Sequence, residues 1–369
     1  MEGGFEDESW SDIFSRIYES SPRWGTYHSR YEGSDRDEDS CEDEDFCEDE
    51  DSYWDIDSAR VDYLNAYIKA KSPVTSTIEP LDAILKGGFR PGLHVIGGNT
   101  GAGKTALALY MAARIASRKD PDTGDNYGVV FYSMELGLLE VRSRIGSMLS
   151  YVMDDLDTFS WSKIEEMAAA ERNRVGGPWP FEDPVCRADM KLVKLCPRLK
   201  NIDATTSSGM AYIDCVEGML QSASRNGASI VFIDYLQCIE TMMKDDEQTA
   251  LRSITRKLNQ LGIRCGVAVV VLSAVSRGSG SAMRSGTAPT TDIFRGSSWI
   301  EYTGLTCMAL VRLNDAEMCG GTVAEQISVV KNRRGACGDV DIGYQGAYGN
   351  FNFMKDAITL SGQKGSECV

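Results

Sequence analysis

The segment Gly98-Asn-Thr-Gly-Ala-Gly-Lys104-Thr105 constrains this chain more than any other, because it matches G-x-x-x-x-G-K-[ST] at every fixed position. The apolar stretch Leu93–Ile96 precedes it, and a helix is predicted over Ala106–Ser117, so the segment forms a strand-to-helix turn. Glycines there allow backbone N–H groups to point at phosphate oxygens, and the helix N-terminus adds positive potential. The alternative interpretation is a glycine turn that merely exposes a lysine.

The motif predicts a nucleotide site that uses ATP and Mg²⁺. We expect Lys104 to reach the β- and γ-phosphates and Thr105 to ligate the metal. The predicted phosphate contacts comprise the whole segment: Gly98, Asn99, Thr100, Gly101, Ala102, Gly103, Lys104 and Thr105.

Apolar strands alternate with helices along the rest of the chain. Further strands are predicted at 129–133, 229–233, 267–273, 307–312 and 326–331, and helices near 81–86, from about 139, and over 212–225 and 249–261. Residues 154–200, which contain four prolines, indicate an insertion or a patch of helix and loop. The alternation predicts an α/β fold: a mainly parallel sheet with helices on both faces.

Two carboxylates follow predicted strands. Asp234 ends the apolar run Ile230–Ile233, and we expect it to hold Mg²⁺ directly or through water. Glu135 follows the strand at 129–133, and ligands of such sheets bind at the carboxyl ends of the strands. Glu135 is therefore our candidate for the base that activates the attacking water. Its alternative role is a favourable acid near a helix N-terminus.

Negative charge is concentrated at the N-terminus. Residues 1–58 hold 21 of the 55 acidic residues and four of the 38 Lys and Arg, so their formal charge of −17 equals that of the whole chain. Such a block repels itself, and we expect residues 1–57 to be a disordered acidic tail. The tail is then either a solvated appendage or a polyanion that imitates nucleic acid or docks on a basic partner surface. Val61, Leu64 and Ile68 have helical spacing and predict a linker helix within 58–74.

The remaining composition argues against several classes of protein. No run of 18 apolar residues exists, so no membrane span is expected, and the acidic start does not resemble a signal peptide. The 11 cysteines form no C-x-x-C pair and only two histidines are present, which favours reduced thiols in a cytoplasmic protein.

Several segments together resemble the motor domain of DnaB-family replicative helicases, which is built on a RecA-like phosphate-loop ATPase core. Ser133-Met-Glu-Leu is similar to the family's S-[LM]-E, and Ile233-Asp-Tyr-Leu-Gln237 to its I-D-Y-L-Q. The segment Asp292–Tyr302 resembles D-x-[FL]-[RK]-x-S-G-x-I-E, and Lys331-Asn-Arg333-Arg-Gly335 resembles K-x-R-x-G. The resemblance covers roughly residues 75–355, and we expect the ATPase domain to span 75–360 and a flexible end to follow over 361–369.

The resemblance implies a homohexameric helicase that hydrolyses ATP and moves on single-stranded DNA during replication. It implies that Lys331 and Arg333 reach the γ-phosphate held by the neighbouring subunit. The alternative interpretation of Arg333 and Arg334 is a solvated turn before Gly335. Single-stranded DNA would contact the loop after Asp234 and, with more weight, the Gly-, Ser- and Thr-rich loop Arg277–Gly296, through Arg277, Arg284 and Arg295.

This sequence departs from the family pattern at two positions and in one domain. Ala274 stands where many relatives have glutamine, Leu305 stands where the family has Asp, and no helical N-terminal domain is apparent. Two other functions therefore stay open. One is a RecA-like ATPase, a recombinase or regulatory motor, that does not unwind DNA. The other is a non-catalytic protein gated by nucleotide binding.

Overall fold

The computed structural model describes residues 70–152, 158–172, 184–206, 208–242, 246–275, 298–318 and 321–353. The chain divides into the units Met1–Lys71 and Ser72–Val369, and the fold and site described below belong to the second unit. The acidic tail, the linker helix up to residue 69, the arginines Arg277, Arg284 and Arg295, and the C-terminal residues 361–369 lie outside the described residues.

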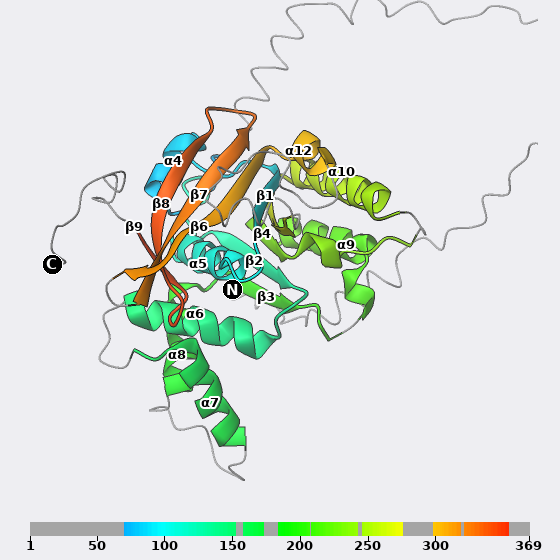
Figure 1. The fold of residues 1–369 in the computed structure, drawn as a ribbon. Helices are drawn as coiled ribbons and strands as arrows, with labels where there is room; N and C mark the ends of the chain where they lie inside the picture. Colours follow the sequence, from blue (N-terminus) through cyan, green and yellow to red (C-terminus); the bar gives the residue numbers. More distant parts are fainter. Residues whose placement is uncertain are drawn as a thin grey trace, which may run out of the picture. The chain divides into compact units, whose positions relative to one another are not determined.

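The described strands form one sheet of nine, in the order β3-β2-β4-β5-β1-β6-β7-β8-β9 (Figure 1). Neighbours from β3 to β6 pair in parallel, and β7, β8 and β9 continue the sheet antiparallel. The strand bounds are β1 Gly92–Gly98, β2 Gly128–Ser133, β3 Leu199–Asp203, β4 Ala228–Asp234, β5 Ala268–Ala274, β6 Thr306–Met318, β7 Thr322–Asn332, β8 Gly338–Gln345 and β9 Asn350–Phe353. This confirms the prediction of a mainly parallel α/β sheet.

Helices cover both faces of the sheet, as predicted. Alternate strand residues such as Phe131, Phe232 and Val270 join the apolar cluster that contains α5, while their buried neighbours on the opposite face lie under α9 and α10. The helices are α4 Glu79–Ile84, α5 Lys104–Ala116, α6 Leu138–Val152, α7 Trp161–Arg172, α8 Pro184–Leu195, α9 Ile213–Arg225, α10 Glu247–Cys265 and α12 Ser298–Thr303 (Figure 1).

Local sequence sets the bounds of α10 and its close approach to the sheet. The Asp246 carboxylate caps the helix by accepting hydrogen bonds from the backbone N–H groups of Gln248 and Thr249, and Gly266 ends it in the left-handed conformation. A Cβ atom on Gly262 would lie 2.9 Å from the Cα of Gly92 on β1. Glycine therefore allows α10 to contact the strand that leads into the phosphate loop.

The structure adds three strands to those predicted. Within 154–200, where a patch of helix and loop was expected, α7 and α8 are followed by β3, a polar strand at the sheet edge that pairs with β2. Strands β8 and β9 were also missed, because Gly338-Asp-Val-Asp-Ile-Gly is too rich in glycine and acid to suggest a strand by itself. β8 forms by pairing with β7, and β9 forms by pairing with β8. No helix in the described part of the chain has the length and apolar character that a membrane crossing requires.

Candidate active site

The phosphate loop runs from the last residue of β1 to the first turn of α5, as the motif predicted. Gly101 and Gly103 have φ of 78° and 83°, a left-handed backbone that favours glycine. The amine of Lys104 folds over the loop and donates hydrogen bonds to the carbonyl oxygens of Gly98 and Asn99, both at 2.9 Å. Burial lowers the pKa of Lys104, and the nearby carboxylates of Asp234 and Glu135 oppose that shift. The loop thus forms a cradle for an anion beside two acids.

Thr105 and Asp234 meet at the carboxyl end of β4. The Thr105 hydroxyl donates to Asp234 Oδ2 at 2.8 Å, and Asp234 is only 2% exposed. Burial raises the pKa of Asp234 to about 6, against the hydrogen bond from Thr105. A hydroxyl and a carboxylate are hard oxygen donors, and Mg²⁺ commonly uses one or two such protein ligands together with phosphates and water. The two side chains therefore fit the predicted metal.

Glu135 lies in a turn that is closed by hydrogen bonds of Ser133, a residue of the same Ser133-Met-Glu-Leu motif. The Ser133 hydroxyl at the end of β2 donates to the carbonyl oxygen of Leu136 and accepts from its N–H, at 2.6 and 3.0 Å. The N–H of Met134 bonds the carbonyl oxygen of Asp234 at 2.8 Å, which ties this turn to the end of β4. Glu135 is exposed, and its charge acts on both Asp234 and Lys104. It therefore faces the same space as the phosphate loop.

Gln237 links the ends of two neighbouring strands. Its amide donates to Ser273 Oγ at 2.9 Å, and its carbonyl oxygen accepts from the N–H of Ala274 at 3.2 Å. In the sequence, Gln237 stands out only as the last residue of Ile233-Asp-Tyr-Leu-Gln237. The contact joins the segment after Asp234 to the last residues of β5, just before the loop that carries Arg277.

Lys331 and Arg333 lie near the amino-terminal ends of the parallel strands, whereas the phosphate loop lies at their carboxyl ends. Asn332 pairs with Thr306, which pairs with His94, four residues before Gly98 on β1. At 3.3 Å per residue this offset alone is roughly 13 Å along the strands. The Arg333 guanidinium donates to the backbone carbonyl oxygens of Tyr302 and Gly304. Within one subunit, therefore, the structure does not bring Lys331 and Arg333 to Lys104.

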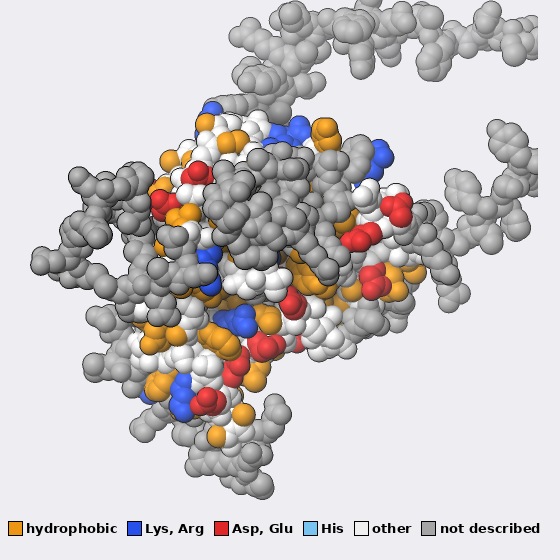
Figure 2. All heavy atoms as spheres, viewed as in Figure 1, with side chains coloured by type: hydrophobic (Ala, Val, Ile, Leu, Met, Phe, Trp, Pro, Cys, Tyr) orange, Lys and Arg blue, Asp and Glu red, His pale blue; other side chains and the backbone are white. Residues whose placement is uncertain are grey.

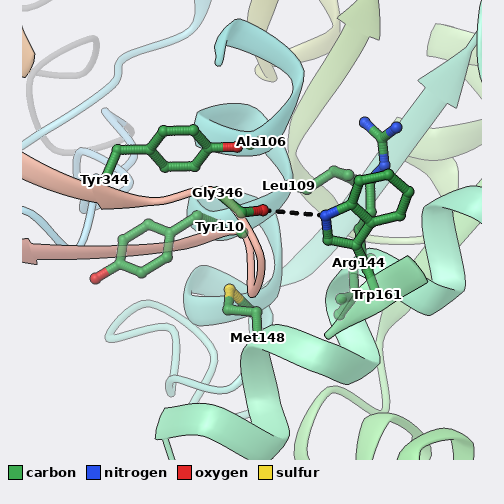
Figure 3. A pocket seen from close by; sticks show the side chains of 10 residues that line it. Ala106, Leu109, Tyr110, Arg144, Met148, Trp161, Tyr344 and Gly346 are labelled. Carbon is green, nitrogen blue, oxygen red and sulfur yellow. Dashed lines mark hydrogen bonds between the residues drawn. The ribbon is translucent and has the colours of Figure 1, made fainter. Parts of the chain in front are cut away.

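A pocket of about 90 Å³ lies beside α5 and α6 and is lined by Tyr110, Arg144 and Trp161 (Figure 3). The Trp161 ring N–H donates to the carbonyl oxygen of Gly346 at 3.0 Å, and the Arg144 guanidinium lies over that ring, 4.9 Å from its centre. The positive charge of Arg144 also acts on Asp234. No sequence pattern singled out Arg144, which follows Glu135 by nine residues on α6.

Comparison with known proteins agrees with this geometry. A family model described as DnaB-like helicase C terminal domain matches residues 73–353. The chain is 28% identical to the replicative DNA helicase DnaB of Treponema pallidum (strain Nichols) over 278 residues, 72% of this chain and 53% of that helicase. It is 25% identical to the replicative DNA helicase DnaC of Bacillus subtilis (strain 168) over 281 residues, 73% of this chain and 54% of that protein.

Among solved structures, a DnaB-like replicative helicase superposes with a TM-score of 0.60 at 23% identity, covering 80% of this chain and 66% of that one. A separately solved ATPase domain superposes with a TM-score of 0.62, also at 23% identity, covering 82% of this chain and 99% of that domain. Structural matches at this sequence identity show that the fold is shared. The chain spans about half the length of the two curated relatives, so the match concerns that portion of them.

Proposed function

Since the chain belongs to the family of DnaB-like helicase C-terminal domains, we propose that it is an ATP-dependent DNA helicase that moves on single-stranded DNA as a homohexameric ring during replication. The observation that carries the proposal is the convergence of Lys104, Thr105, Asp234 and Glu135 from three separate segments at one edge of a RecA-like sheet. A phosphate cradle, a metal-binding pair and an exposed carboxylate are the groups that phosphoryl transfer to water requires.

Each residue of the site has one task in the proposed reaction. Lys104 and the N–H groups of the loop hold the phosphates and neutralise charge as the terminal phosphoryl group departs. Thr105 and Asp234 would hold Mg²⁺, which would supply positive charge against the developing negative charge of the phosphates. Glu135 accepts a proton from the attacking water, since its side chain is exposed beside the loop.

The proposed ring completes each site at a subunit interface. Arg333 and Lys331 lie too far along the sheet to serve their own phosphate loop, so we assign them to the neighbouring subunit's nucleotide. An arginine supplied in this way stabilises charge in the transition state. To act, the Arg333 side chain must exchange the carbonyl oxygens of Tyr302 and Gly304 for phosphate oxygens.

Single-stranded DNA is assigned to the loop between β5 and α12. Arg277, Arg284 and Arg295 would contact DNA phosphates without sequence preference. The hydrogen bonds of Gln237 to Ser273 and Ala274 support this assignment, because they join the nucleotide site to the residues that lead into this loop. A cytoplasmic location remains part of the proposal and rests on the free cysteines expected from the sequence.

One comparison separates the helicase from its two rivals. We expect single-stranded DNA to raise the ATP hydrolysis rate several-fold, and ATP hydrolysis to drive strand separation on a forked duplex. A motor with another task would hydrolyse ATP without separating strands. A non-catalytic, nucleotide-gated protein would bind ATP without turnover. Steady-state ATPase assays with and without DNA, followed by fluorescence unwinding assays, give the answer.

The acidic tail is expected to lower affinity for single-stranded DNA. Residues 1–58 carry −17, whereas the rest of the chain is neutral. On the face drawn in Figure 2, the described Lys and Arg side chains lie interspersed with Asp and Glu. Electrostatic repulsion of DNA by the tail is screened within about 10 Å at 0.1 M salt and about 30 Å at 0.01 M. Removing residues 1–57 should therefore tighten binding several-fold at low salt and change it little at high salt.

Fluorescence anisotropy titrations of both chains across a salt series test this expectation. Equal affinities at every salt concentration would contradict it. They would leave the tail as a solvated appendage or as a dock for a basic partner, which binding to a polycation of matched length would then distinguish.

A further inference from the structure

Glu325 on β7 is a buried carboxylate that the proposed reaction does not use. It is 0% exposed, and neither of its oxygens has a hydrogen-bond partner among the described residues. Most buried polar groups are hydrogen-bonded, so a fully buried carboxyl without a hydrogen-bond partner calls for an explanation. Its side chain lies on the same face of the sheet as Ile327 and Val329, which pack in the core around α5.

This carboxyl lies against the phosphate loop. A Cβ atom on Gly103 would be 3.6 Å from Glu325 Oε2 and 3.5 Å from the ring of Tyr344 on β8. Because the loop's N–H groups hold the phosphates, a bound nucleotide would lie well within the screening length of about 10 Å from Glu325. The loop backbone and the Tyr344 ring lie beside this carboxyl, and such surroundings screen charge less than water does.

Among the residues that the structure describes, few charged groups compensate for Glu325. Arg312 on β6 approaches Oε1 at 3.9 Å and is itself 40% exposed on its side chain. Tyr344 is the titratable neighbour on β8, with Arg144 of α6 acting on it in turn. Lys104, at the start of α5, directs its amine to the carbonyl oxygens of Gly98 and Asn99. Burial raises the pKa of Glu325 to about 8, and Arg312 opposes the shift.

We propose that Glu325 is a proton-binding site coupled to the nucleotide site, so that ATP binding on the phosphate loop takes up a proton at this carboxyl. The polyphosphate repels a carboxylate but not a neutral carboxylic acid, so it favours the protonated form. This coupling sets the direction of the pH dependence of ATP affinity. Below pH 8 the carboxyl is already protonated, so ATP binds at full affinity. Above pH 8 the carboxyl must bind a proton when ATP binds, so the affinity for ATP falls by up to about tenfold per pH unit.

Isothermal titration calorimetry of ATP into the full chain tests the coupling. At pH 8 and 9, runs in buffers of different ionisation enthalpy give the number of protons taken up, and a series from pH 6.5 to 9.5 gives the pH dependence of affinity. We expect uptake of a large fraction of a proton at pH 8–9 and almost none at pH 6.5. The isosteric variant Glu325→Gln should take up fewer protons by that fraction and keep its affinity as the pH rises.

Two further variants sharpen the result. Glu217→Gln on α9, a matched change on the opposite face of the sheet from α5, should behave as wild type. Arg312→Gln removes the positive neighbour of Glu325, so the onset of proton uptake should move to higher pH. Equal proton uptake and equal pH dependence in the wild type and Glu325→Gln would overturn the inference and leave the proposed ATPase intact. The inference rests on that proposed function, and an absence of ATP binding to the wild type would overturn both.

Discussion

Glu135→Gln is expected to lower the rate of ATP hydrolysis by about 10²–10⁴-fold while ATP binding is retained, because general-base catalysis contributes that much. Glutamine keeps the shape and the exposed position of the side chain but cannot accept the proton of the attacking water. Phosphate contacts come from the loop and Lys104, and these remain in the variant. Steady-state hydrolysis and calorimetric binding of ATP measure the two effects separately.

Glu140→Gln supplies the matched control for this experiment. Glu140 is the next carboxylate along the chain, and it accepts a hydrogen bond from the N–H of Gly137 at the start of α6. Its replacement should affect that helix terminus and leave hydrolysis close to wild type. If Glu135→Gln also hydrolysed ATP at the wild-type rate, Glu135 would serve only the helix N-terminus, as the competing interpretation holds.

Arg333→Ala is expected to lower hydrolysis by about 10³–10⁵-fold, the range for an arginine that acts in trans, and its activity should return on mixing with an equally inactive partner. That partner is Lys104→Ala, which loses the charge that holds the phosphates. Because neighbours in a ring meet head to tail, up to about a quarter of the interfaces in an equal, random mixture combine an intact loop with an intact arginine. ATPase assays on the two variants, alone and mixed, measure the recovery.

The register of the sheet is the reason to expect recovery. β7 runs antiparallel to β6, so the carboxyl end of β7 lies beside the amino-terminal ends of the parallel strands. Gly98 lies at the carboxyl end of β1, on the other side of the sheet's length. Arg334→Ala, a change at the adjacent exposed arginine, is the control and should hydrolyse ATP almost normally. A mixture that stayed as inactive as its components would contradict the assignment of Arg333 to the neighbouring subunit.

Contiguous sequence was enough to predict the fold class and most of its strands. The phosphate loop, the Asp234 strand and the Ser133-Met-Glu-Leu segment are each short, and each couples an apolar run to a polar end. Their backbone preferences and apolar patterns are local, so these segments can be located in the sequence without knowledge of the strands that pair with them. The structure confirms the strands, the helix after the loop and the sheet's mainly parallel pairing, while the catalytic roles of the residues stay predictions.

Long-range pairing decided the rest. Strands β3, β8 and β9 have weak apolar patterns and form because each has a paired neighbour in the sheet. The place of Arg333 follows from the direction of β7, and no local pattern contains that direction. Glu325 shows the difference most clearly: its sequence neighbours predict a strand, but its burial against Gly103 depends on strand order across more than 200 residues. The sequence gives the polarity of each side chain, whereas its solvation and electrostatic environment are determined only when distant strands pack together.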